Sequence, residues 1–170
     1  TGAMILSSET AIDNTENAGQ LHDRLMHLGC DTVIGTLKLI ESKNVTTTIQ
    51  NDNSDIKTAY KLNKENCKID WSKSTADIHN LIRGLSPYPA AWCYFADKDE
   101  EWNVKIYEAK TILERHNYKI GSLICTKKEM KIATNEGFIQ ILSLQFPGKK
   151  KMATAELLNS IAFSESAKAY

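Results

Sequence analysis

The chain does not begin with Met, and it lacks the cysteine and histidine patterns that anchor most metal and disulfide sites. Its cysteines contain no CxxC pair, and its histidines show no ligand spacing, so a metal site is not expected. The four cysteines are interpreted as free, buried thiols of a reducing compartment: Cys30, Cys67, Cys93 and Cys125.

Long apolar runs and a strong net charge are also missing. No stretch approaches the ~20 apolar residues that a membrane-spanning helix needs, and the first residues lack a signal-peptide pattern. Basic and acidic side chains both number 21, so the formal net charge is zero. The 170 residues, 42% of them hydrophobic, predict one packed domain or a domain plus a remnant.

The charge is unevenly distributed along the chain. Residues 1–56 carry three basic and eight acidic side chains, whereas residues 105–151 carry ten basic and four acidic ones. This asymmetry predicts two parts, the second of which can meet a polyanion. On charge alone, a solvated lysine-rich surface explains the same pattern equally well.

Helical spacing of apolar residues marks the first forty positions. Residues 21–28 predict a helix with one buried face that ends at Gly29, and residues 33–40 predict a second helix capped by Asp31. The polar run at 43–55 has no helical period and is interpreted as a linker.

A second helical segment is predicted from Ser74, because Ser74 and Asp77 match a capping box. Its apolar face is formed by residues 78, 81, 82 and 85, and Gly84 is placed to end it. Pro87 and Pro89 prevent continuation. Upstream, the lysines at 57, 61, 64 and 68 would share one face if that segment were helical.

Short strands are predicted from residue 90 to about residue 144. Apolar and polar residues alternate over 102–107, and a hairpin turn is predicted at 135–137. Such a series favours a closed or partly closed antiparallel barrel, followed by a last helix over 153–162. Four aromatic residues are interpreted as core rather than base-stacking groups: Trp71, Tyr88, Trp92 and Trp102.

Four motifs occur in a fixed order along this region. They are IDW at 69–71, SPYP at 86–89 shortly before a Trp, A-T-x-x-G at 133–137 and LQ-x-x-GKK at 144–150. Together they resemble the C-terminal domain of methionyl-tRNA formyltransferases over residues 56–160. The opening TGAM and residues 16–40 are similar to the end of the catalytic domain of that family, where an Asp directly precedes the Thr.

The resemblance implies a mainly β protein with helices, namely an OB-like antiparallel barrel preceded by an α-helical remnant of a Rossmann-like formyltransferase domain. Residues 1–43 would be the remnant, 44–60 the linker and 61–170 the tRNA-binding domain. The opening is expected to be a cut within the catalytic domain, and a cloning scar ahead of Met4 is the alternative.

The resemblance also implies the activity of the full-length enzyme. That enzyme transfers a formyl group from formyl-tetrahydrofolate, its co-substrate, to initiator methionyl-tRNA in translation initiation. The catalytic Asn, His and Asp of the family have no match here, so the chain is expected to be inactive alone and to carry no cofactor or metal. It is expected to be a monomer of the bacterial cytoplasm, with an organelle as the alternative, and to have no membrane partner.

Carried over by position, Lys61 and Lys64 fall in the linker-to-barrel stretch, and Lys149 and Lys150 form the GKK pair. Lys151 has no settled counterpart. Charge alone adds four candidates to this predicted tRNA-binding set: Arg83, Lys127, Lys128 and Lys131. Contacts between lysines and phosphates supply affinity and orientation with little sequence reading.

Two alternatives remain open at this point. One is another folate-dependent formyltransferase, acting on an aminosugar nucleotide or hydrolysing the folate, in which the GKK motif is not expected. The other is a stand-alone OB-type nucleic-acid-binding module, which would have no use for the helical residues 11–42.

Overall fold

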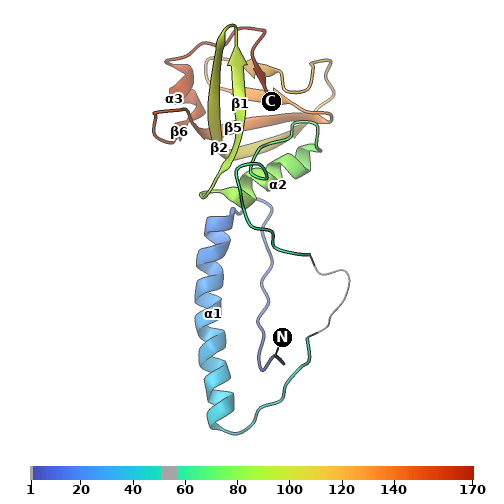
Figure 1. Cartoon of the computed structure of the whole chain (residues 1–170), viewed down its shortest axis with the longest axis vertical. Helices are drawn as coiled ribbons and strands as arrows, with labels where there is room; N and C mark the ends of the chain where they lie inside the picture. The colour runs from blue at the N-terminus through green and yellow to red at the C-terminus, as the bar shows by residue number, and fades with distance from the viewer. Residues whose placement is uncertain (1, 51–56) are drawn as a thin grey trace. The chain divides into compact units, whose positions relative to one another are not determined.

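The computed structural model describes residues 2–50 and 57–170, and the chain divides into two compact units, Thr1–Lys61 and Leu62–Tyr170 (Figure 1). Part of the predicted linker lies outside the described residues. Its described flanks, 44–50 and 57–60, contain no helix, and the polar composition predicts this for the first of them. In the first unit, an isolated antiparallel bridge joins Met4 to Thr48.

A single helix, α1 (Ala18–Glu41), occupies the place of the two predicted helices, so that prediction is wrong. Gly29 lies inside α1, because a helical glycine costs only about 1 kcal/mol relative to alanine and does not by itself end a helix. The cap is Asn17, whose side chain accepts the Gln20 amide at 2.9 Å, while the Gln20 side chain accepts the Asn17 amide at 3.0 Å.

The apolar face predicted for this region is present on α1, but it is not buried. No residue of the helix is buried within the part of the chain that the structure describes. The apolar side chains at 25, 26, 33, 34, 37 and 40 are each about half exposed. The helix is tied instead to the preceding segment through Arg24, whose Nη2 lies 2.6 Å from Glu16 Oε2 and donates to the Ala11 carbonyl at 2.7 Å.

In the second unit, α2 (Thr75–Leu85) begins as predicted at Ser74. The Ser74 Oγ accepts the Asp77 amide at 3.0 Å and donates to the Asp77 carboxylate at 2.7 Å. Ile78, Ile82 and Leu85 are buried, and the helix extends one residue past Gly84. The lysine-bearing segment before it is not helical, because residues 64–67 form a turn.

Seven strands form one antiparallel sheet, which curls into the barrel that the sequence predicts (Figure 1). The strands are β1 (Ala91–Asp97), β2 (Glu100–Leu113), β3 (Leu123–Cys125), β4 (Met130–Ala133), β5 (Gly137–Gln145), β6 (Met152–Ala153) and β7 (Lys168–Ala169). Their order is β3-β4-β5-β2-β1-β7, with β6 added beside β5.

The barrel closes where β7 meets the start of β3. The Ala169 amide donates to the Gly121 carbonyl at 2.7 Å, and the Leu123 amide donates to the Ala167 carbonyl at 3.0 Å. Gly121 has φ +82, and a Cβ there would collide with the Ala169 carbonyl. Glycine is therefore required at this junction, because it alone combines the left-handed conformation with so close an approach.

The predicted alternation is confirmed on β2, where Val104 and Ile106 are buried and Lys105 is exposed. The apolar face of α2 contacts β1, β2 and β5, and α2 lies across one end of the barrel (Figure 1). The core of buried apolar side chains lies entirely between residues 67 and 169. The second unit thus contains a complete core of its own.

Two local predictions are corrected by this packing. The last helix, α3 (Thr154–Leu158), is much shorter than the predicted span of 153–162. The Thr154 hydroxyl donates to the Ile141 carbonyl at 2.7 Å. Among the aromatic residues interpreted as core, Trp71 and Trp92 are buried and Trp102 is partly buried, but Tyr88 is 86% exposed. Tyr88 lies in the turn between Pro87 and Pro89, which projects it away from the barrel.

No helix in the described ranges has the length and apolar character that a bilayer crossing requires.

Candidate nucleic-acid interface

The three lysines that follow β5, Lys149–Lys151, are all exposed and are here called the lysine tail. The Lys149 amide donates to the Phe146 carbonyl at 3.0 Å, and the Gln145 side chain donates to the Lys149 carbonyl at 2.8 Å, so the backbone is held against β5. Lys151 differs from its neighbours, because its Nζ lies 2.8 Å from Glu108 Oε1 and 5.1 Å from the centroid of the Tyr107 ring.

Lys64 lies at the start of the barrel unit and is fixed by Trp92. Its carbonyl accepts the Trp92 indole N–H at 2.8 Å, and its Nζ lies 5.3 Å from the Trp92 ring centroid. Lys61 is exposed and is the last residue of the first unit. The lysine tail and Lys64 are therefore positioned by contacts with strands β5 and β1, respectively.

The candidates proposed from charge alone lie elsewhere. Lys127 and Lys128 are exposed in the turn between β3 and β4, where the Thr126 hydroxyl oxygen accepts the Lys128 amide at 3.2 Å. Lys131 is half-buried on β4, opposite Gln140. Arg83 is in the last turn of α2 and donates from Nε to Asn80 Oδ1 at 2.9 Å.

Strand order separates these candidates into groups. β1 and β4 are not neighbours, because β2 and β5 lie between them in the sheet. Lys64 contacts β1, and the lysine tail follows β5, whereas Lys127, Lys128 and Lys131 belong to the β3–β4 hairpin. The eight predicted residues of the second unit thus lie on several different elements of the barrel unit.

Two basic residues outside the predicted set lie between Lys64 and the lysine tail. Lys68 pairs with Trp92 in an isolated parallel bridge, and Lys105 lies opposite both Trp92 and Gln145. The strand alternation at 102–107 already placed the Lys105 side chain outside the barrel. Lys68 gives no comparable signal, because its segment has no strand period and its lysine spacing indicates a helix instead.

Histidine and acidic side chains can serve either a metal site or the packing of the fold. No group of three His, Cys, Asp or Glu side chains in the described residues could hold a metal ion. His79 is half-buried on α2, and that desolvation lowers the pKa of its imidazole. His116 contacts the Gly137 carbonyl at 2.9 Å and packs on Phe138, so this histidine serves the fold.

The four cysteines are free thiols, as interpreted, but only two of them are buried. Cys67 and Cys93 are buried and Cys125 is half-buried, whereas Cys30 on α1 is exposed. Burial raises the pKa of Cys67 and Cys93, and it raises the pKa of Cys125 to about 11. None of these three thiols is therefore an activated nucleophile at neutral pH.

Known proteins resemble the chain over its whole length. It is 70% identical over 170 residues to a methionyl-tRNA formyltransferase of Flavobacterium johnsoniae, covering all of this chain and 54% of that protein. It is 62% identical over 167 residues to the protein of the same name in Flavobacterium psychrophilum, covering 98% of this chain and 53% of that protein. In Bacteroides thetaiotaomicron the identity is 38% over 173 residues, covering 99% and 54%.

The chain spans about half the length of these curated relatives. A family model described as formyl transferase, C-terminal domain, matches residues 61–162, which is more than half of the chain and nearly all of the barrel unit. The resemblance drawn from the four motifs is thereby confirmed. The chain belongs to the formyl transferase family and contains its C-terminal domain.

Proposed function

We propose that the chain is the tRNA-holding part of a methionyl-tRNA formyltransferase. The observation that carries this proposal is the 70% identity, along all 170 residues, to a bacterial protein of that name. The full-length enzyme would transfer a formyl group from formyl-tetrahydrofolate to initiator methionyl-tRNA. All three relatives named above are bacterial, which supports a bacterial cytoplasmic location.

Within this proposal the chain supplies binding and orientation, not chemistry. Formyl transfer needs a proton acceptor for the attacking amine and donors for the developing oxyanion. The family supplies these from an Asn, a His and an Asp that have no counterpart in this sequence. We therefore expect no formyl transfer by this chain alone, and no cofactor bound to it.

Lysines outside the barrel would hold the sugar–phosphate backbone of the tRNA. Lys64, Lys149 and Lys150 are exposed and form no ion pair within residues 2–50 and 57–170, so a phosphate could reach them without displacing a carboxylate. Lys151 would first have to leave Glu108. The remaining predicted contacts, which stay part of the proposal, are Lys61, Arg83, Lys127, Lys128 and Lys131.

A tRNA-binding assay tests this function. The binding of the chain to a fluorescent initiator tRNA transcript is measured by anisotropy at several KCl concentrations. The affinity is expected to fall steeply with salt, because each neutralised phosphate releases counterions. Replacing Lys149, Lys150 and Lys151 with Ala should lower the slope of log K against log salt by roughly two to three. A control triple variant at the exposed Lys38, Lys73 and Lys119 should leave the slope unchanged.

Absence of binding at low ionic strength, or binding that does not respond to salt, would contradict the proposal. A second assay supplies the chain with formyl-tetrahydrofolate and charged tRNA. Measurable turnover would show that the catalytic groups lie within this chain. An aminosugar nucleotide added as a competitor should not displace the tRNA, which separates this function from that of the other folate-dependent formyltransferases.

A further inference from the structure

We propose that the outer face of β1 and β2 carries additional contacts to the RNA backbone, made by Lys68 and Lys105, with Trp92 and Tyr170 as positioning residues. This inference rests on the proposed function and specifies which wall of the barrel meets the RNA. It adds two lysines to the predicted set.

The side chains concerned lie in one row across the sheet, here called the Lys68 row. Lys68 is bridged to Trp92, Trp92 is directly opposite Lys105, and Lys105 is directly opposite Gln145. Directly opposed residues in a sheet point to the same face. Neighbouring strands are about 4.8 Å apart, so the Cα atoms of Lys68 and Lys105 are roughly 10 Å apart. Trp92 lies between the two lysines in the row.

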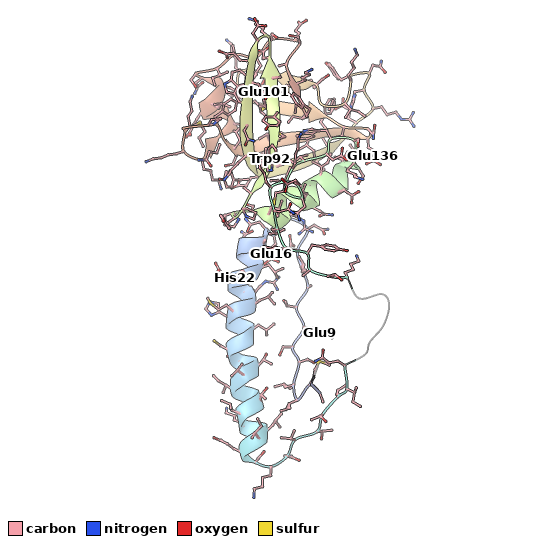
Figure 2. All side chains as sticks on the ribbon, viewed as in Figure 1. Glu9, Glu16, His22, Trp92, Glu101 and Glu136 are labelled. Carbon is pink, nitrogen blue, oxygen red and sulfur yellow. The ribbon has the colours of Figure 1, made fainter. Side chains whose placement is uncertain are left out.

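Lys68 is surrounded by three aromatic rings. Its Nζ lies 5.7 Å from the centroid of Trp92, 5.2 Å from that of Tyr94 and 5.7 Å from that of Tyr170. The rings also contact one another, with centroids 5.3 Å apart for Trp92 and Tyr94 and 5.7 Å for Tyr94 and Tyr170. Trp92 lies on the barrel, as its label in Figure 2 shows.

This arrangement fixes an ammonium group without neutralising it. Ring faces attract a cation through their quadrupole but carry no net charge. Lys68 and Lys105 form no ion pair with the described carboxylates, unlike Lys151, which is paired with Glu108. A phosphate approaching Lys68 therefore meets a full positive charge whose side chain is already ordered, so binding loses less conformational entropy.

The row also connects the two lysine groups that the sequence predicted. Lys64, Trp92 and Lys105 line one surface hollow of about 290 Å³. At the other end of the row, Gln145 accepts the Tyr107 hydroxyl at 2.8 Å and donates to the Lys149 carbonyl at 2.8 Å. The lysines before α2 and the lysine tail are thus the two ends of one basic surface.

A second row on the barrel provides a matched comparison. Lys131, Gln140 and Lys110 are directly opposed across β4, β5 and β2. Lys105 and Lys110 lie on the same strand, are both exposed and each face a glutamine of β5. They are five residues, or about 17 Å, apart along β2. No aromatic ring lies under the Lys110 or Lys131 ammonium group in the described residues.

The first experiment compares alanine variants of the whole chain, with initiator tRNA transcript as the probe and KCl titrated. Lys68→Ala and Lys105→Ala should each weaken binding severalfold and reduce the salt slope by about one. Lys110→Ala should leave affinity and slope unchanged. Equal losses at Lys105 and Lys110, or no loss at Lys68 and Lys105 while the parent chain binds, would overturn this inference and leave the proposed function intact. No binding by the parent chain would contradict both.

The positioning role is tested at Tyr170, which is exposed and therefore replaceable without loss of the core. Tyr170→Ala removes one ring from beside Lys68 and should weaken tRNA binding about two- to fivefold, the worth of one cation–π contact. Tyr170→Phe keeps the ring and should bind as the parent does. In a Lys68→Ala background the Tyr170→Ala change should have no further effect. Additive losses would show that Tyr170 does not act through Lys68.

Heparin and a polyuridylate of tRNA length serve as competing probes. Displacement of tRNA by polyuridylate at a similar nucleotide concentration is expected, because backbone contacts read no sequence. If heparin competes equally well but polyuridylate does not, the row is a general polyanion surface and the assignment to RNA is wrong.

Discussion

Lys64 and Trp92 contact each other twice: the Trp92 indole N–H donates to the Lys64 carbonyl at 2.8 Å, and the Lys64 ammonium lies 5.3 Å from the Trp92 ring centroid. The two residues are 28 positions apart in the chain. Trp92 is also bridged to Lys68, so a single strand residue holds both ends of the segment that leads into the barrel.

This relationship predicts that Trp92→Phe loosens the 64–68 segment. The change removes the indole N–H and leaves the Lys64 carbonyl without that donor, and it also removes buried volume. The free energy of unfolding should fall by about 1–3 kcal/mol. Urea unfolding followed by circular dichroism measures the change, and trypsin should cut after Lys64 and Lys68 sooner than in the parent chain.

Tyr88→Phe is the matched control, because Tyr88 is an aromatic residue near the same strand but is 86% exposed. Its stability and cleavage rate should equal those of the parent. Equal destabilisation by the two changes would mean that the contact with Lys64 is unimportant for the fold.

A second prediction concerns the independence of the barrel unit. Every member of the core cluster lies between Cys67 and Ala169, and the family match begins at residue 61. The chain shortened to residues 62–170 should therefore fold by itself, since it keeps a complete core. It should unfold in one cooperative transition with nearly the urea midpoint of the barrel in the whole chain.

The shortened chain could instead keep its helix and strand content and lose its sharp side-chain NMR signals. That result would indicate a loosened core and contradict this prediction.

The barrel and α2 could be predicted from the sequence because their signals are local. Alternation at 102–107 gave β2 its two faces, and Ser74 with Asp77 gave the start of α2. The helix α1 was divided in two because Gly29 and Asp31 resemble a stop and a cap, although Asn17 already supplies the cap. Local propensity cannot reveal that a helix continues through a glycine when its neighbours maintain the backbone hydrogen bonds.

The candidate site was predicted less completely than the fold. Lys64 and the lysine tail followed from the family motifs, but the place of Lys68 depends on a bridge to Trp92, 24 residues away in the sequence. Contacts between distant segments leave no periodic pattern. Lys127, Lys128 and Lys131 follow from local charge density, which contains no information on strand order, and the structure places them on the β3–β4 hairpin.

A third prediction follows from the contact between Asp97 and Ser164. The Asp97 carboxylate accepts the Ser164 amide at 2.8 Å and also the Ser164 hydroxyl, and these hydrogen bonds hold the pKa of Asp97 below its usual range. Asp97→Asn should cost about 1–3 kcal/mol of unfolding free energy at pH 7, since a charge-assisted contact is lost.

The direction of the pH dependence follows from the lowered pKa of Asp97. In the unfolded chain the Asp97 carboxyl titrates at about pH 3.9. The stabilisation is therefore present above that pH and is lost as the pH falls through the lower pKa that Asp97 has in the folded chain. The difference between parent and Asp97→Asn should therefore shrink in urea titrations below about pH 4. Asp99→Asn, two residues away in an exposed turn, is the control and should leave the unfolding free energy at pH 7 close to that of the parent.

A fourth prediction concerns thiol reactivity, which should separate the cysteines by exposure. Cys30 is exposed, whereas burial raises the pKa of Cys93 and raises that of Cys125 to about 11. Because the thiolate is the reactive form, a disulfide reagent at pH 8 should label one thiol rapidly in the native chain. All four should react in denaturant. Cys30→Ser should abolish the rapid phase, and a rapid phase that survives this change would contradict the burial of the other three.

The same burial predicts an alkaline loss of stability. In the unfolded chain the Cys93 thiol ionises at about pH 8.5, whereas in the folded chain it stays protonated to a higher pH. The unfolded state therefore binds fewer protons above that pH, and stability should decline as the pH rises further. Unfolding free energies at pH 8 and pH 10 should diverge more for the parent than for Cys93→Ala, which has no thiol to ionise at that position. An equal decline in both chains would place the alkaline sensitivity at other groups.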